Sequence, residues 1–158
     1  MSNTLIWYAP LGTTPATWQA AFGTEIDSLA SGSYALSSII IDNTSGLLTD
    51  GWISMALGSV APSAAAAALA FFLQQLNQDG TTYGDGIASG TVIPVSGWCG
   101  SFTWPTSSTA AAQTGTLKMS IEIPPNKFKL GVVNQLGSAL AASGNTISLA
   151  LNKLNLNG

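Results

Sequence analysis

Side chains capable of acid–base, nucleophilic or metal chemistry are scarce in this chain. Only 7% of its 158 residues are charged, and it contains no histidine and no arginine. Acid–base catalysis near neutral pH relies mainly on histidine, or on carboxylates and lysines with shifted pKa values. Metal sites gather His, Cys, Asp or Glu. We therefore predict that the protein is not an enzyme and that it binds neither a cofactor nor a metal ion.

The charged residues that are present form no basic patch. Four lysines and seven acidic residues give a net charge of −3. Nucleic-acid binding needs a basic face that displaces counterions from phosphates, so we expect no nucleic-acid partner. Several charged residues alternate with apolar ones, and we interpret them as the solvated outer positions of strands: Lys118, Glu122, Lys127 and Lys129.

Two short segments contain residue types that could bind a ligand. The loop Asp79–Gly86, DGTTYGDG, combines two carboxylates with three glycines. It lacks the residue order and terminal Glu of an EF-hand, so we interpret it as a solvent-exposed turn, and Asp42-Asn43 as an Asx turn.

Cys99 is the only cysteine, which excludes an intrachain disulfide. Its neighbours offer no cation that would lower the thiol pKa, so a buried structural thiol is expected.

Large aromatic residues are the side chains best suited to binding. The five tryptophans are Trp7, Trp18, Trp52, Trp98 and Trp104. Such residues anchor cores and subunit interfaces, and they can also stack on sugar rings.

The first 27 residues differ from the rest, since aromatic residues there lie among prolines and glycines. We predict an N-terminal arm or short helix over residues 1–27, with ATWQAAF (16–22) as the helical stretch. The segment either packs on its own core or docks on a neighbouring chain. For docking, the candidate interface residues are Trp7, Tyr8, Trp18 and Phe22.

Residues 28–158 are predicted to form one all-β domain. Apolar and polar residues alternate over 34–41, 51–60, 117–123, 128–132 and 147–151, which is the period of a half-buried strand. A further strand-like run, 91–105, is interrupted by Pro94 and Gly97, and residues 106–115 resemble a polar loop. Pro124-Pro125-Asn126 is expected to form a corner between strands. About eight antiparallel strands favour a jelly-roll-like β-sandwich.

Segment 62–76, PSAAAAALAFFLQQL, is ambiguous. Its five consecutive alanines favour a helix, whereas the strands on both sides favour a strand. We predict a strand for ALAFFLQQL, residues 68–76. The longest apolar run, residues 64–73, is too short to cross a bilayer. Because the N-terminus also lacks signal-peptide features, we expect a soluble protein made in a cytoplasm, without a membrane partner.

Four segments occur in a recognisable order along the chain. They are SLASGSYALSS (28–38) with IDN (41–43), DGTTYGDG (79–86), IPPNKFKLGVVNQLG (123–137) and ALAASGNTISL (139–149). With this ordered set, the sequence resembles a group of small structural proteins of tailed bacteriophages. The resemblance covers most of residues 28–151 and leaves the aromatic N-terminal 27 residues outside.

The resemblance implies a jelly-roll component of the virion that serves as a capsid cement or decoration protein. It implies an outer capsid location after synthesis in the host cytoplasm, with the major capsid protein as partner. A homo-oligomer, dimer or trimer, is also expected, because symmetric homo-oligomers are the common case. The alternative is a carbohydrate-binding receptor-recognition module, a fibre or spike head, that stacks sugars on Trp98, Trp104 or Tyr83. A third option is a tail or portal part.

Overall fold

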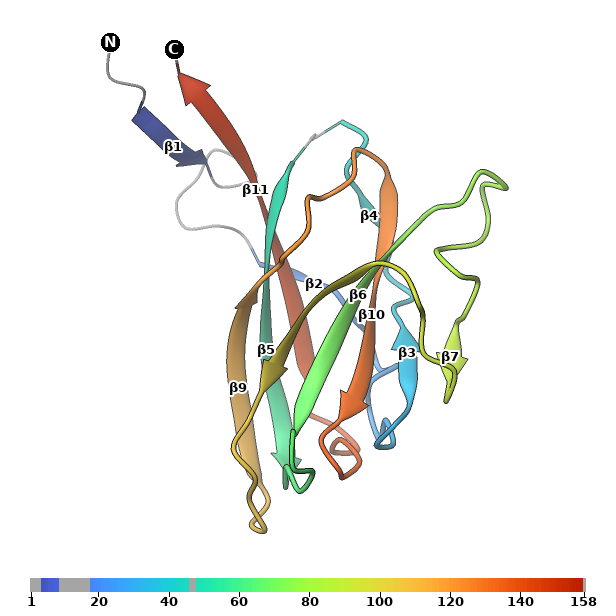
Figure 1. The fold of residues 1–158 in the computed structure, drawn as a ribbon, viewed down its shortest axis with the longest axis vertical. Helices are drawn as coiled ribbons and strands as arrows, with labels where there is room; N and C mark the ends of the chain where they lie inside the picture. Colours follow the sequence, from blue (N-terminus) through green and yellow to red (C-terminus); the bar gives the residue numbers. More distant parts are fainter. Residues whose placement is uncertain (1–3, 9–17, 46–47, 158) are drawn as a thin grey trace.

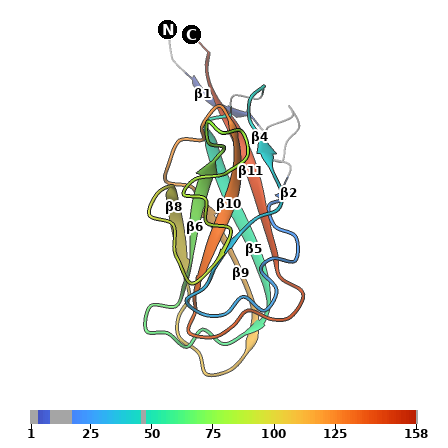
Figure 2. The ribbon, with the colours of Figure 1, turned by 90° about the vertical axis from the view of Figure 1, so that its right-hand side faces the viewer.

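The protein is an all-β sandwich of two antiparallel sheets packed face to face (Figures 1 and 2). The computed structural model describes residues 4–8, 18–45 and 48–157, and it describes side chains for residues 18–45 and 48–152. Within these ranges there is no helix, so no helix is long and apolar enough to cross a membrane. The predicted all-β class is confirmed.

The five-stranded sheet has the order β1-β11-β5-β9, and β2 also pairs with β11. Its strands are β1 (Thr4–Tyr8), β2 (Gln19–Ala20), β5 (Asp50–Val60), β9 (Ala111–Lys118) and β11 (Thr146–Asn157). The six-stranded sheet has the order β7-β3-β10-β6-β8, and β4 also pairs with β10. Its strands are β3 (Tyr34–Leu36), β4 (Ile41–Asp42), β6 (Ala68–Gln75), β7 (Ser89–Gly90), β8 (Trp98–Thr103) and β10 (Lys127–Gln135).

The main core lies between the two sheets and is formed by alternate residues of the long strands. Strand β5 contributes Ile53, Met55 and Leu57, all buried. The facing strands of the other sheet contribute Leu69, Phe71 and Leu73 from β6, with Phe128, Leu130 and Val132 from β10. The two-residue alternation that predicts these strands therefore matches the alternation of buried and outward-facing residues along them.

A second, smaller apolar layer covers the outer side of the six-stranded sheet. It consists of Tyr34, Ala70, Phe72 and Val133, with Leu36 and Ile87 packed against it. The Tyr34 and Phe72 rings meet edge to face with centroids 6.3 Å apart. Strand β6 is consequently buried on both faces, which explains why its sequence is continuously apolar instead of alternating.

Most connections between the long strands cross from one sheet to the other. The chain crosses between β5 and β6, between β8 and β9, between β9 and β10, and between β10 and β11. Three of the eleven strands in the described ranges have only two residues, β2, β4 and β7, and β1 lies in the predicted N-terminal arm. Seven longer strands remain within residues 28–158, against about eight predicted, and the strand predicted over 117–123 ends at Lys118. The strand order does not confirm the expected jelly-roll connectivity.

Several local predictions meet a clear outcome. Residues 68–75 are a strand, as predicted, and Ala64–Ala66 precede it as a turn. Pro124–Asn126 forms the corner between β9 and β10, where Asn43 donates a side-chain hydrogen bond of 2.9 Å to the Pro124 carbonyl. The polar loop predicted over residues 106–115 is wrong in its second half, because Ala111–Gly115 belongs to β9. Its small side chains suit an edge strand whose residues are mostly exposed.

The N-terminal helix is not found in the part of residues 16–22 that the structure describes. Gln19 and Ala20 form β2 instead, paired with Leu149 and Ser148 of β11. Ala16 and Thr17 lie outside the described residues. Pairing with an existing strand edge supplies hydrogen-bond partners that a short isolated helix would lack.

Candidate binding face on the five-stranded sheet

Two exposed tryptophans flank one small residue on the outer face of the five-stranded sheet. Trp52 of β5 pairs with Ala150 of β11 and is 38% exposed. Trp18 immediately precedes β2 and is 44% exposed. Because Gln19 pairs with Leu149, continuing that register by one residue sets Trp18 opposite Ala150 on the other side of β11. Ala150 itself is almost fully buried. We call these three residues the tryptophan face.

The ladder between β1 and β11 extends the five-stranded sheet beyond the sandwich. Strand β11 pairs with β5 over Thr146–Asn152 and with β1 over Lys153–Asn157. The β1–β11 ladder projects from the body, with the two chain ends side by side (Figures 1 and 2). In this ladder Trp7 pairs with Leu154, and Leu5 pairs with Leu156.

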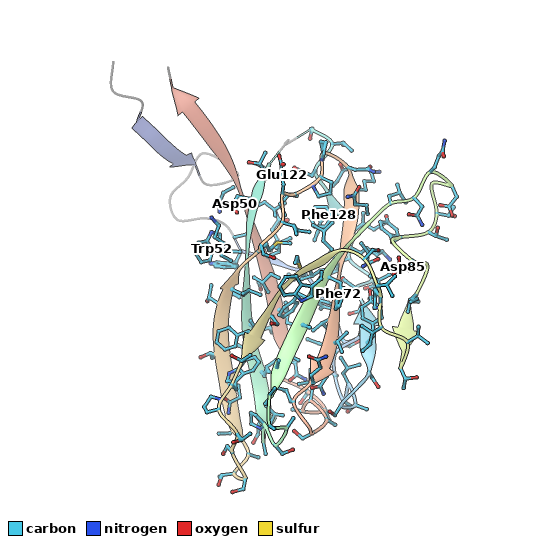
Figure 3. The ribbon with its side chains drawn as sticks, viewed as in Figure 1. Asp50, Trp52, Phe72, Asp85, Glu122 and Phe128 are labelled. Atoms are coloured by element: carbon cyan, nitrogen blue, oxygen red, sulfur yellow. The ribbon has the colours of Figure 1, made fainter. Side chains whose placement is uncertain are left out.

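An ion pair and a shallow cavity lie beside the tryptophan face. Lys118 of β9 pairs in register with Trp52, and its Nζ lies 3.3 Å from Oδ2 of Asp50. A cavity of about 360 Å³ is lined by Thr49, Asp50, Lys118, Met119, Ser120, Ile121 and Glu122. Figure 3 shows Asp50 and Trp52 together in the part of β5 nearest the projecting ladder, with Glu122 close by. Polar groups are thus available next to an exposed indole.

The four predicted interface residues occupy different environments. Trp18 is exposed on the tryptophan face, whereas Phe22 is 6% exposed and packs in the core of its own domain. Trp7 and Tyr8 are consecutive in β1, where they pair with Leu154 and Lys153 of β11.

The residues proposed for sugar stacking are mostly unavailable. Tyr83 and Trp104 are 8% and 9% exposed; Lys129 Nζ lies 4.9 Å from the Tyr83 ring centroid, and the Phe102 ring lies against Trp104. Two of the three predicted stacking residues are therefore contradicted by their burial. Trp98 is 50% exposed. It pairs with Phe72, whose side chain belongs to the outer layer of the six-stranded sheet, so Trp98 lies on the opposite side of the sandwich from Trp52.

Exposed apolar residues accompany Trp98. Val92, Ile93 and Val95 precede it in the connection from β7 to β8, and Val95 is 94% exposed. We call Val92, Ile93, Val95 and Trp98 the β8 apolar segment. The protein thus presents large apolar side chains on both outer surfaces, on the tryptophan face and on the β8 apolar segment.

The acidic loop at residues 79–86 uses its carboxylates for internal hydrogen bonds. Asp79 accepts from the Thr82 hydroxyl and from the N–H groups of Thr82 and Thr81, which lowers the pKa of its carboxyl to about 2. Asp85 accepts from the Ser96 hydroxyl and the Val95 N–H, and these bonds lower its pKa. In residues 18–45 and 48–157, no group of three or more acidic or cysteine side chains could hold a metal ion. The loop is built as a turn that braces the connection to β8.

Cys99 lies in the main core and is fully buried. Burial raises the pKa of its thiol to about 12. A thiol in this state is a poor nucleophile because the thiolate is the reactive form.

From the sequence, Trp52 is one of five tryptophans suited to binding, but it is not singled out as an interface or stacking residue. A large aromatic residue among small polar ones on the outer side of a strand is the signal that could have found it. Pairing of Trp52 with Ala150, ninety-eight residues later, depends on the fold and is not visible in the sequence.

Comparisons with known proteins do not identify a relative. No protein-family model matches the chain, and neither the curated proteins nor the solved structures searched contain a match.

Proposed function

We propose that this protein is a bacteriophage virion protein of the capsid cement or decoration type, which binds the major capsid protein on the outer surface of the shell. The observation that carries the proposal is the tryptophan face, where Trp18 and Trp52 are exposed on the outer side of one sheet. Large aromatic residues, tryptophan above all, are enriched at the centre of protein interfaces.

Bridging two capsid subunits requires two separate contact surfaces on one molecule. The tryptophan face and the β8 apolar segment lie on opposite sides of the sandwich, which supports a bridging role. A protein that binds the assembled shell and not the separated subunits stabilises the shell by mass action. Many copies repeat this contribution, so each contact can be weak.

The test is reconstitution of shells that lack this protein. Shells with added wild-type protein should dissociate at a higher temperature than bare shells. The double variant Trp18→Ser/Trp52→Ser should bind less and stabilise less, and Trp98→Ser tests the second contact surface in the same assay. If wild-type protein neither binds the shells nor changes their dissociation temperature, the proposal is wrong.

A specific observation also favours a second candidate, a carbohydrate-binding module of a fibre or spike head. Trp52 lies beside a cavity lined by Asp50, Lys118 and Glu122, and an indole next to charged groups suits a sugar ring. Titration with glycans, followed by tryptophan fluorescence, distinguishes the two candidates. Saturable quenching that is lost in Trp52→Ser favours the sugar module, and unchanged fluorescence favours cement.

A further inference from the structure

The projecting β1–β11 ladder has an open strand edge of an unusual kind. In the described ranges, β1 pairs only with β11, over five consecutive positions without a register shift. The backbone N–H and C=O groups on the other edge of β1 have no strand partner there. Isolated two-stranded ladders are marginally stable in water, so this ladder would gain from a further strand.

The other sheet edges carry features that discourage strand addition. The β9 edge ends at Lys118, and its pairing with β5 contains a register shift between Leu57 and Ser59. The β8 edge contains a bulge opposite Phe71 and Phe72 and follows Pro94. Strand β7 has only two residues. Charges, bulges, prolines and short strands are the devices by which proteins protect sheet edges.

Strand β1 carries none of these devices. Its sequence, TLIWY, contains no charge, proline or glycine, and β-branched and aromatic residues favour strands. In a symmetric contact between two copies, β1 of one copy lies against β1 of the other. Because β1 contains no charged residue, no like charges meet across such a contact.

We infer that β1 pairs antiparallel with β1 of a second copy of this chain, making a symmetric dimer with a continuous β11-β1-β1-β11 sheet. The inference deepens the proposed function by naming the partner of the N-terminal arm. The pairing centres on Ile6, so that Ile6 lies opposite Ile6 and Leu5 opposite Trp7 of the second copy. The faces of the ladder stay open in this arrangement, because strand addition uses only the backbone edge.

The test uses the purified, untagged full chain and measures mass by analytical ultracentrifugation over a range of concentrations. Wild-type protein should sediment as a dimer. Ile6→Lys and Ile6→Glu should each be monomers, since the two-fold axis sets like charges directly opposite each other. An equimolar mixture of the two variants should restore a dimer that contains one chain of each.

Matched controls place the same charges on a protected edge. Thr114→Lys and Thr114→Glu, on β9, should both remain dimers. A wild-type monomer at every concentration, or an Ile6→Lys chain that still dimerises, would overturn the inference. No shell is present in this measurement, so a monomer would leave the cement proposal standing, whereas a dimer that fails to bind shells would contradict only the cement proposal.

Discussion

The hydroxyl of Tyr34 is a polar group enclosed in an apolar layer. Its side chain is fully buried, and the hydroxyl has no hydrogen-bond partner in the structure. Burial raises the pKa of Tyr34, and the negative charge of Asp85 raises it further. The ring lies over Gly131 of β10, where a side chain would collide with the hydroxyl. Glycine at position 131 is therefore required by the ring of Tyr34.

We predict that Tyr34→Phe stabilises the fold by about 1 kcal/mol, because it removes a buried group without a partner. Gly131→Ala should destabilise it by roughly 2 kcal/mol or more, since the added methyl group overpacks the layer. Urea denaturation measures both effects. A Tyr34→Phe variant less stable than wild type would show that the hydroxyl has a partner.

The same tyrosine predicts a pH dependence at the alkaline end. A folded-state pKa above the ordinary value of 10.0 means that the unfolded chain loses the Tyr34 proton more readily. Stability from this group is complete below pH 10 and declines as the pH rises above it. Tyr34→Phe should lose less stability than wild type between neutral pH and pH above 10, measured by thermal denaturation. An equal loss in both proteins would assign the alkaline effect to other groups.

The two tryptophans of the tryptophan face should matter for binding and not for folding. Surface substitutions usually change stability by less than about 0.5 kcal/mol, whereas losing an interface anchor costs about 2 kcal/mol or more of binding energy. Trp18→Ser and Trp52→Ser should therefore keep the wild-type melting temperature within a few degrees. Each should weaken shell binding by roughly 30-fold, the equivalent of 2 kcal/mol. Normal binding by both variants would show that the tryptophan face does not contact the shell.

At the level of elements, the long connection between β6 and β8 depends on Gln74. This residue is 2% exposed on β6. Its Nε2 donates to the Ser96 carbonyl at 2.9 Å, and its Oε1 accepts from the Asp85 N–H at 3.3 Å. The connection also holds Asp79 and Asp85 in turns. A single buried amide thus fixes two distant points of the loop to the sheet.

We predict that Gln74→Ala loosens the connection while its neighbour Gln75→Ala, exposed at the end of β6, does not. The loss leaves buried polar groups without partners, at a cost of about 1–3 kcal/mol. Hydrogen exchange over residues 77–97 should rise in Gln74→Ala and stay unchanged in Gln75→Ala. Equal exchange in the two variants would show that the loop is held by other contacts.

Acid should loosen the same connection. The pKa of Asp79 is lowered from 3.8 to about 2 by its hydrogen bonds from Thr82 and Thr81. A lowered folded-state pKa contributes stability above the unfolded value, and this contribution is lost as the pH falls from about 3.8 to about 2. Hydrogen exchange in residues 79–86 should therefore rise over that interval, and Asp79→Asn should show the increase already at neutral pH.

How far the sequence predicts this fold varies among its elements. The strands predicted over 51–60, 128–132 and 147–151 are confirmed. Each has one face against the core, and this one-sided burial produces the two-residue alternation seen in the sequence. Strand β6 could be identified only from context, because burial on both faces removes the alternation. Strand β9 was half missed, since small polar residues such as Thr114 carry no apolar pattern at an exposed edge.

The candidate site was less predictable than the fold. Trp18 was identified from its residue type, but Phe22, of similar type, lies in the core. The difference arises from the register of β2 on β11, which is a long-range property. The β1–β11 ladder joins the two ends of the chain, a pairing that no local pattern encodes.

For the molecule as a whole, the low charge sets how binding should respond to salt. A chain with four lysines and a net charge of −3 has few ion pairs to offer a partner, and salt screens only such pairs. We predict that shell binding changes little between low and high salt, measured by cosedimentation. A steep loss of binding at high salt would indicate that the Asp50–Lys118 region, and not the tryptophan face, dominates the contact.

In the proposed role, this sandwich acts by being bound to a shell of other proteins. On the proposed phage origin, this role is tested by the copy number of the chain in purified phage particles, determined by quantitative mass spectrometry against the major capsid protein. We expect a fixed, roughly stoichiometric ratio to the major capsid protein. Absence from the particle, or only a few copies in each, would contradict it.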